Sequence, residues 1–144
     1  MNKLYNLLHS YGNISTDTIQ EYFDKAEKSL QKVRNINRQN LQLEYTFVKL
    51  YLLQRKIFQS LHYKKESLES LLQAQKLIKN VLIIYPYKVQ LLQTAAEIEE
   101  QLGNYTQAKQ YYKKMLLSND HLQQLNKKEI NSIIQKINSL IQRE

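Results

Sequence analysis

The sequence contains no cysteine, and this absence removes several classes of protein. Without thiols there is no disulfide framework, no thiolate metal site and no cysteine nucleophile. Glycine occurs only at Gly12 and Gly103, and proline only at Pro86. Sheet proteins need Gly- and Pro-rich turns every ~8–12 residues, which this chain cannot supply. Long helices need neither residue, so the composition predicts an all-α fold.

Long apolar runs are also missing. The most apolar window, residues 81–87, is far shorter than the ~20 residues of a membrane span. The N-terminus leads into no apolar core and no small-residue cleavage site, so we expect no secretory signal. The 144 residues fit one domain. We therefore expect a soluble, intracellular protein, in the cytoplasm or inside an organelle.

The formal net charge of +8 is spread along the chain. Basic residues exceed acidic ones by 11 to 7 in residues 1–72 and by 10 to 6 in residues 73–144. Such a balance favours acidic partners and solubility, and says little about the fold. The heavy use of Lys, Asn, Ile, Tyr and Gln is typical of A/T-rich coding, as in an organelle or an A/T-rich microbe.

An internal repeat appears in the spacing of apolar residues. Two sets of four share a three-four-three spacing, which is one face of a helix, and the second set follows the first by about 34 residues. The sets are Leu71, Ala74, Ile78 and Val81, and Tyr105, Ala108, Tyr112 and Met115. Alanine stands second in both, where a small side chain lets a neighbouring helix approach closely. The sequence therefore predicts a helical repeat with this period.

A third copy lies upstream and consists of Phe23, Ala26, Leu30 and Val33. Its separation from the next copy exceeds one period by about 14 residues, equal to roughly 21 Å of helix. We place these inserted residues in an elongated helix between about Arg38 and His62, where an apolar stripe continues. The competing placement is a longer loop around residues 63–66.

Turn and cap residues agree with this division. Gly12 and the residues after it separate a first short helix from the next, with Ser15 or Thr16 as N-cap. Pro86 ends one helix, and Gly103 ends another that runs from about residue 87 to 102. Residues 118–121 close the last repeat. A final helix begins near Asn126, with one apolar face formed by Ile130, Ile133, Ile134, Ile137, Leu140 and Ile141.

At this point the chain resembles the tetratricopeptide repeat family, whose unit is a pair of antiparallel helices with the same period. The best copy, from about Val89 to Asp120, has the typical residues Leu92, Ala96, Gly103, Tyr105, Ala108 and Tyr112. The preceding copy keeps Phe58, Leu61, Ala74, Ile78 and Pro86. Four positions depart from the pattern: Glu99 replaces an aromatic residue, Met115 and His62 replace small ones, and Glu69 replaces the turn glycine.

The resemblance implies an all-α, right-handed stack of antiparallel helix pairs in a single domain over residues 1–144. Its parts would be a degenerate repeat over about 1–34, a repeat with an elongated first helix over 38–86, the best repeat over 87–120 and a capping helix over 126–143. An ordinary helical bundle would bury the same apolar stripes and stays the alternative.

No catalytic or metal site is expected. The three histidines, His9, His62 and His121, are far apart and match no metal-ligand spacing. Two glycines cannot build a phosphate-binding loop, and no nucleophile elbow is present. We therefore expect a protein that is not an enzyme and uses no cofactor or metal.

The resemblance implies a concave groove lined by the first helix of each pair. In the best repeat the exposed stripe would be Gln90, Gln93, Glu97, Glu100 and Gln101. An acidic, amide-rich stripe on a basic protein suits a basic or polar peptide. Gln93 and Glu97 stand where some family members carry the Lys and Asn that clamp a partner's C-terminal carboxylate. The expected function is a scaffold or adaptor that holds a peptide or helix of another protein, such as an assembly factor for a photosystem in a plastid.

Two other functions stay open. Lysine pairs beside aromatic residues, at 63–65 and 111–114, could bind RNA through its phosphates. Alternatively, the isoleucine-rich C-terminal helix could pair with a second copy and form a homo-oligomer, although capping the stack is the default role of such a helix.

Overall fold

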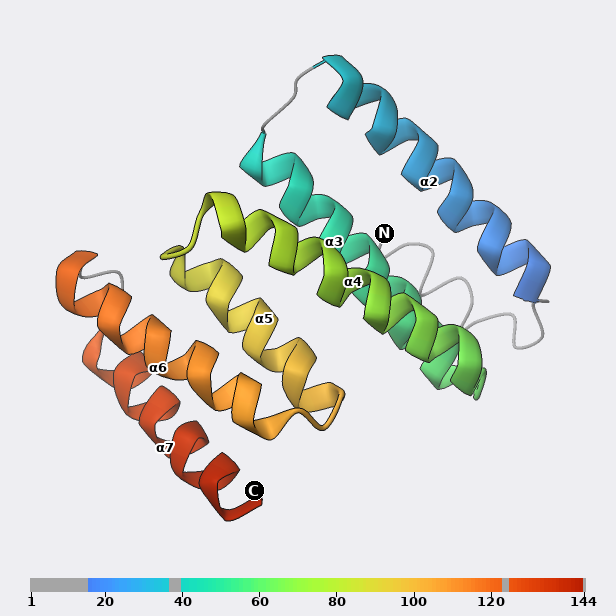
Figure 1. Cartoon of the computed structure of the whole chain (residues 1–144). Helices are drawn as coiled ribbons and strands as arrows, with labels where there is room; N and C mark the ends of the chain where they lie inside the picture. Colours follow the sequence, from blue (N-terminus) through green and yellow to red (C-terminus); the bar gives the residue numbers. More distant parts are fainter. Residues whose placement is uncertain (1–15, 37–39, 123–124, 144) are drawn as a thin grey trace. The chain divides into compact units, whose positions relative to one another are not determined.

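A computed structural model describes residues 16–36, 40–122 and 125–143, apart from the side chains of 119–122 (Figure 1). This part of the chain contains six helices and no strand, which confirms the predicted all-α class. The helices are α2 (Thr16–Ile36), α3 (Leu41–Ser60), α4 (Lys64–Ile84), α5 (Val89–Gln101), α6 (Tyr105–Leu122) and α7 (Lys127–Arg143). The short helix predicted before Gly12 lies outside the described residues.

The chain forms two compact units, Met1–Ala74 and Gln75–Glu144. Helix α4 begins in the first unit and ends in the second. The first unit contains α2, α3 and the start of α4. The second contains the end of α4 followed by α5, α6 and α7.

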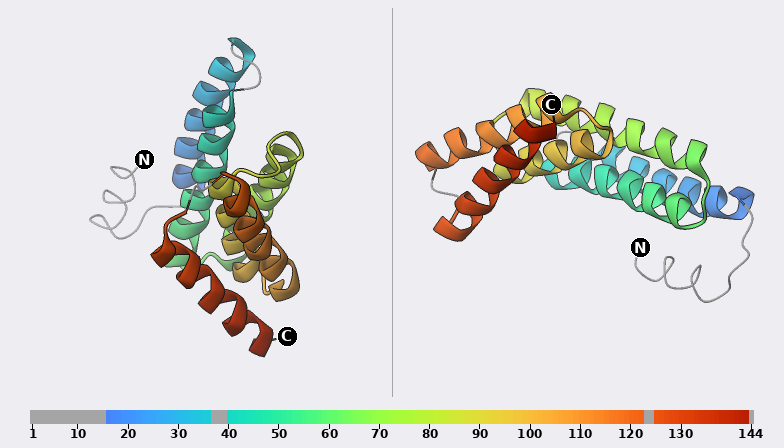
Figure 2. Two further views of the ribbon diagram at one scale, coloured as in Figure 1. Left: turned by 90° about the vertical axis from the view of Figure 1, so that its left-hand side faces the viewer. Right: turned by 90° about the horizontal axis from the view of Figure 1, so that it is seen from below.

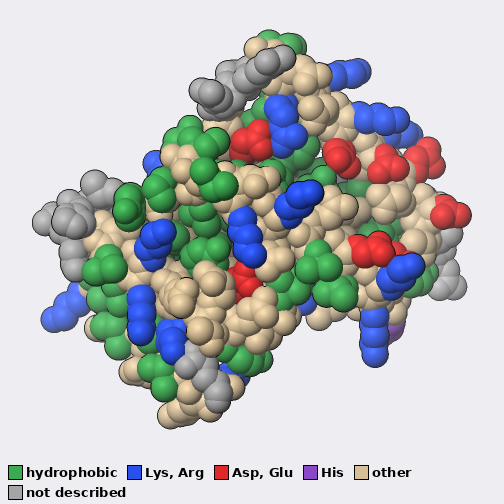
Figure 3. All heavy atoms as spheres, viewed as in Figure 1, with side chains coloured by type: hydrophobic (Ala, Val, Ile, Leu, Met, Phe, Trp, Pro, Cys, Tyr) green, Lys and Arg blue, Asp and Glu red, His purple; other side chains and the backbone are tan. Residues whose placement is uncertain are grey.

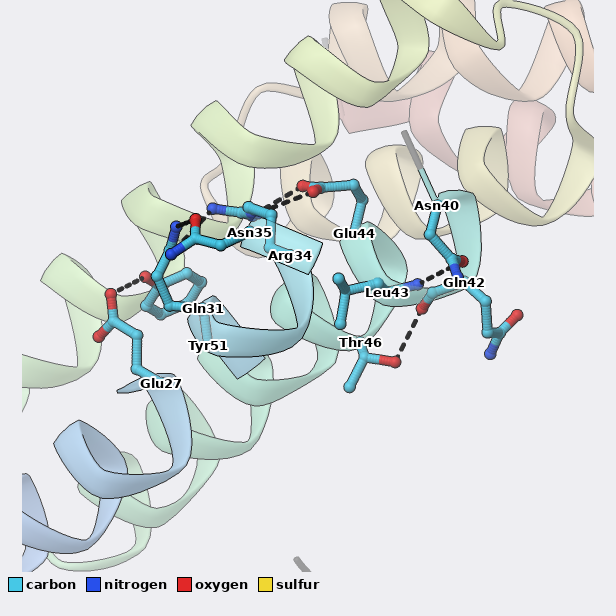
Figure 4. Close-up of polar contacts among 10 residues, drawn as sticks. All are labelled: Glu27, Gln31, Arg34, Asn35, Asn40, Gln42, Leu43, Glu44, Thr46 and Tyr51. Carbon is cyan, nitrogen blue, oxygen red and sulfur yellow. Dashed lines mark hydrogen bonds and ion pairs between the residues drawn. The ribbon is translucent and has the colours of Figure 1, made fainter. Parts of the chain in front are cut away.

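In the first unit α2 packs against α3 around a small aromatic and aliphatic core. Its buried residues are Ile19, Phe23, Leu50, Ile57 and Phe58. Helix α3 begins where Asn40 accepts a hydrogen bond from the backbone N–H of Leu43 at 3.2 Å (Figure 4). This is the usual N-cap arrangement, and it supplies an acceptor to one of the free N–H groups of the first turn.

The end of α2 is joined to α3 by polar contacts. The guanidinium of Arg34 donates two hydrogen bonds to the carboxylate of Glu44, at 2.8 and 2.7 Å (Figure 4). The same guanidinium lies 3.8 Å from the ring centroid of Phe47. Val33, predicted to be on the buried face, is 48% exposed. That prediction is wrong because Arg34, the next residue, covers the core at this end of α2.

The inserted residues lengthen helices and form no loop. Only Leu61, His62 and Tyr63 connect α3 to α4. Helix α3 has 20 residues against 13 in α5, and α4 begins seven residues before Leu71, the repeat counterpart of Tyr105, where α6 begins. Each helix of this pair thus gains two turns. Seven residues are close to two turns of 3.6, so the buried face is preserved.

The turn between α3 and α4 therefore lies earlier than the repeat spacing predicts. Glu69, the expected turn position, lies inside α4, and His62 occupies the turn with φ of +64°. Gly103 has φ of +78° at the matching place between α5 and α6. In both turns the second residue after the C-cap donates to a carbonyl five residues back: Tyr63 to Phe58 at 2.8 Å and Asn104 to Glu99 at 2.9 Å. Both helices end in a Schellman motif.

In the second unit α5 packs against α6, and α6 packs against α7 (Figure 2). The core contains Val89, Leu92, Ala96, Ala108, Tyr112, Met115, Ile133, Ile137 and Leu140. Ala108 is fully buried, as the repeat spacing predicted for a close helix crossing. Ala74, the matching alanine of the preceding copy, is buried as well.

The boundaries of the last two helices lie close to the predicted ones. Helix α6 continues to Leu122, one residue beyond the segment 118–121 that was expected to close the last repeat. Helix α7 begins with a capping box: Asn126 accepts from the N–H of Glu129 at 2.9 Å, and Glu129 accepts from the N–H of Asn126 at 3.4 Å. Of the six residues predicted for its apolar face, Ile133, Ile137 and Leu140 are buried, whereas Ile134 and Ile141 are 42% and 50% exposed.

Candidate functional site

A hollow lies in the second unit where α5, α6 and α7 meet. It is lined by Gln93 and Glu97 of α5, Tyr112 and Met115 of α6, Leu125, and Glu129, Ser132, Ile133 and Lys136 of α7. Its space is about 450 Å³, counting the open mouth. The lining is amphipathic, since buried apolar groups lie beside carboxylate, amide and hydroxyl groups.

The floor of the hollow belongs to the hydrophobic core. Met115 and Ile133 are 1% and 7% exposed, and Tyr112 is 2% exposed. The Tyr112 hydroxyl donates a hydrogen bond of 2.5 Å to Glu100. Burial, and next the hydrogen bond to Glu100, raise the pKa of Tyr112 well above its usual value of 10.0. The phenol therefore remains a protonated donor, and the floor stays uncharged.

The rim carries two carboxylates from different helices. Glu97 is exposed and accepts a hydrogen bond from Gln93 at 3.4 Å. Glu129 is exposed at the start of α7. Among the described side chains no Lys or Arg forms an ion pair with either carboxylate. Lys136, the cation of the hollow, is instead bound to Glu100 at 3.5 Å and lies 5.7 Å from the Tyr112 ring centroid.

The predicted stripe on α5 divides into two groups. Gln90, Gln93, Glu97 and Gln101 are exposed, and Gln93 and Glu97 line the hollow. Glu100 is half-buried, and its partners Tyr112 and Lys136 hold it in place. Glu100 thus binds two residues that line the hollow, and Glu97 is the carboxylate of the stripe that lines the hollow itself.

The contribution of α7 was not anticipated from the sequence. Glu129, Ser132 and Lys136 line the hollow together. Their spacing of three and four residues places them on one helical face, and this spacing is visible in the sequence. Only the packing of α7 on α6 shows that this face lies opposite the stripe on α5.

Glu99, which stands where the tetratricopeptide repeat pattern has an aromatic residue, is a buried structural group. It is 2% exposed and accepts hydrogen bonds from Gln75 at 2.9 Å and from Asn104 at 2.7 Å. Lys79 lies 3.9 Å from the same carboxylate. A buried charge is tolerated when it is hydrogen-bonded and paired in this way. Glu99 therefore joins α4, α5 and the turn after α5, and it is not available to a ligand.

A second hollow lies in the first unit, between α2, α3 and the start of α4. Its polar lining includes Glu27, Glu66 and Glu69 together with Gln54, which is 7% exposed. Glu27 accepts a hydrogen bond from Tyr51 at 3.0 Å, and Gln54 donates one to Gln20 at 3.3 Å (Figure 4 shows the first). These bonds join α2 to α3, so Glu27 and Gln54 help to hold the unit together.

The histidine and acidic side chains of the described residues form no candidate metal site. No group of three or more His, Asp or Glu residues among them is placed to hold a metal ion. His62 is exposed in its turn, His9 lies outside the described residues, and the side chain of His121 is not described. Of the described helices, none is long and apolar enough to cross a membrane.

Comparison of the sequence with protein-family models and with curated proteins finds no match. The interpretation of the hollow therefore depends on its geometry and chemistry.

Proposed function

We propose that the chain is a non-enzymatic, tetratricopeptide-repeat-like scaffold that holds a peptide or helix of another protein in the hollow between α5, α6 and α7. The observation that carries this proposal is the lining itself. Two solvent-facing carboxylates, Glu97 and Glu129, lie beside an apolar floor of Met115 and Ile133. Such a site suits a long basic side chain, whose aliphatic stem can cover the floor while its charge meets the carboxylates.

The helix pairs support the repeat part of the proposal. The pairs α3–α4 and α5–α6 have three-residue connections and end their first helix in the same Schellman motif. Ala74 and Ala108, which hold the same place in successive repeats, are both fully buried. Within such a repeat α5 would line the concave side, where the exposed stripe of α5 would meet the partner. A role as an assembly factor that guides a subunit into a larger complex is the biological form that we favour.

RNA binding is the weaker candidate because two of the aromatic residues beside the lysine pairs pack against the protein. Tyr112 is 2% exposed, and the ring of Tyr63 packs edge-on against Phe58 with centroids 6.2 Å apart. Single-stranded nucleic acid is held by stacking on exposed rings together with phosphate contacts. The ring of Tyr112 is therefore unavailable to a base, and the ring of Tyr63 is partly covered.

Site-specific crosslinking tests the proposal directly. A photo-crosslinking amino acid placed at Gln93 should capture a partner in the native host, whereas the same group at Gln110, exposed on α6 away from the hollow, should not. Mass spectrometry of the adduct then identifies the captured segment. Equal capture at both positions would show that the hollow has no special role.

The captured segment, made as a synthetic peptide, tests whether the negative charge of the hollow contributes to binding. Glu97→Lys should weaken its binding by at least about tenfold, because a like charge replaces the carboxylate that receives the basic side chain. Gln110→Lys changes the net charge in the same direction on an exposed site and should change affinity little. Fluorescence anisotropy measures both affinities, and circular dichroism verifies that each variant keeps its helix content.

A further inference from the structure

Four large hydrophobic residues are exposed near the ends of α4 and α6 in the second unit. Ile83 is 79% exposed, Ile84 63%, Tyr87 59% and Leu117 64%. Together with Lys113 and Lys114 they form what we call the basic–apolar patch. Soluble proteins rarely gather so many protruding apolar side chains unless the surface meets a partner.

The members of the patch come from segments that lie close together. The ammonium of Lys114 is 5.7 Å from the ring centroid of Tyr87, which joins α6 to the connection after α4. Leu82 and Leu116, the chain neighbours of Ile83 and Leu117, both pack against the same hydrophobic cluster. Figure 1 shows α4 and α6 ending at the same end of the unit, and hydrophobic and basic side chains alternate there in Figure 3.

The patch lies on the opposite side of α6 from the hollow. Tyr112 and Met115 are buried in the floor of the hollow, whereas Lys113, Lys114 and Leu117 are exposed. At 3.6 residues per turn these two sets point in opposite directions from the helix axis. A partner bound in the hollow and an occupant of the patch would therefore not compete for the same side chains.

The described charged side chains of this region have one sign. Residues 70–96 contain no acidic residue, and neither do residues 101–119. Lys76, Lys88, Lys113 and Lys114 are exposed in these segments. Among the described residues Lys113 and Lys114 form no ion pair, and Lys114 instead lies over Tyr87. The occupant should accordingly be both apolar and negatively charged.

We propose that the basic–apolar patch binds the surface of an anionic phospholipid membrane. Its apolar side chains protrude, with exposed fractions above one half, so they suit a deformable surface that they can enter. A groove-bound peptide would instead need side chains that line a concavity. Isoleucine and leucine would enter the interface, tyrosine would lie at the headgroup level, and the lysines would meet lipid phosphates. Nucleic acid would use the lysines and leave the isoleucines without a role.

Vesicle flotation with the full chain tests this proposal. Vesicles of phosphatidylcholine mixed with phosphatidylglycerol should recruit the protein, and vesicles of phosphatidylcholine alone should recruit far less. The double variant Ile83→Gln, Ile84→Gln should reduce partitioning by about tenfold or more, since it removes the inserted apolar groups. The double variant Lys113→Gln, Lys114→Gln should reduce it to a similar degree and should remove most of its salt dependence.

Matched controls lie elsewhere on the second unit. Ile134→Gln, Ile141→Gln removes two exposed isoleucines of α7, and Lys127→Gln, Lys128→Gln removes an exposed lysine pair at its start. Both should bind anionic vesicles nearly as well as the unaltered chain. Circular dichroism confirms folding; if the Ile83, Ile84 variant does not fold, Tyr87→Gln replaces it, with the same loss expected.

Several outcomes would overturn the proposal. If the Ile83, Ile84 variant binds anionic vesicles as well as the unaltered chain, the protein adsorbs by charge alone. The same conclusion follows if the Lys127, Lys128 variant loses as much binding as the Lys113, Lys114 variant. Equal recruitment to both kinds of vesicle would remove the anionic requirement. Binding to a labelled single-stranded RNA, with no binding to either vesicle, would assign the lysines to nucleic acid.

Discussion

His62 and Gly103 occupy equivalent positions in the turns after α3 and α5, but only His62 has a side chain. Both have a positive φ after the last turn of a helix, +64° and +78°. A side chain in this left-handed region costs about 1–2 kcal/mol, a cost that glycine avoids. An added Cβ at Gly103 would meet no atom within 4 Å, so any penalty there comes from the backbone alone. The histidine thus carries strain that its counterpart lacks.

We therefore expect opposite effects at the two turns. His62→Gly should raise the free energy of unfolding by up to about 1 kcal/mol, and Gly103→Ala should lower it by about 1 kcal/mol. Urea denaturation followed by circular dichroism measures both. Destabilisation by His62→Gly would show that the imidazole makes a contact worth more than the strain.

Tyr51 links the stability of the first unit to alkaline pH. Its burial, and next the charge of Glu27, raise the pKa of Tyr51 from 10.0 to about 12. The folded unit keeps the proton longer than the unfolded chain does, so stability is full below about pH 10 and falls as the pH rises towards 12. Tyr51→Phe should make this decline shallower in thermal melts across that range. Tyr22→Phe, at an exposed tyrosine of α2, should leave it unchanged.

At the scale of elements, α3 and α4 show how a helix pair can grow without losing its packing. Each is longer by two turns than the repeat pattern requires, so the buried face returns to the same direction. An insertion confined to one helix would have left its extra turns without a partner in the pair. The connection between α3 and α4 therefore stays three residues long, and the inserted residues lengthen the two helices.

The close crossing of α5 and α6 is tested at Ala108. This alanine is fully buried, and a larger side chain there has no space without moving one helix. Ala108→Phe should lower the free energy of unfolding by ~1–3 kcal/mol through overpacking. Gln110→Phe places the same ring on an exposed site of the same helix and serves as the control. Equal effects in urea denaturation would contradict a close crossing at Ala108.

At the scale of the molecule, the net charge is spread evenly along the sequence, but acidic and basic side chains lie on different surfaces of the second unit. In the second unit the acidic side chains Glu97 and Glu129 lie at the hollow, whereas Lys113 and Lys114 lie on the other side of α6. Charge counts over halves of the chain average these regions together. The two surfaces differ in sign and shape, which is why we assign them to different occupants.

Local rules in the sequence determined much of this protein. The scarcity of glycine and proline determined the all-α class, and the three-four-three spacing identified the buried apolar residues of α4 and α6, although it also included the half-buried Tyr105. The glycine turn followed from capping preferences, and the start of α7 near Asn126 followed from the apolar stripe of the last helix. The spacing and capping signals each depend on residues within a few turns of one another.

Tertiary packing decided what local patterns leave free. Whether the insertion extended the helices or a loop depended on where the chain turned between α3 and α4. The turn lies at His62, whereas the repeat spacing had placed it at Glu69. Two features depend on contacts between different helices. One is the side of the hollow formed by α7, and the other is the binding of Glu100 by Tyr112 and Lys136. Helical periodicity gives the direction of a side chain from its own axis, and only the neighbouring helices determine what it meets there.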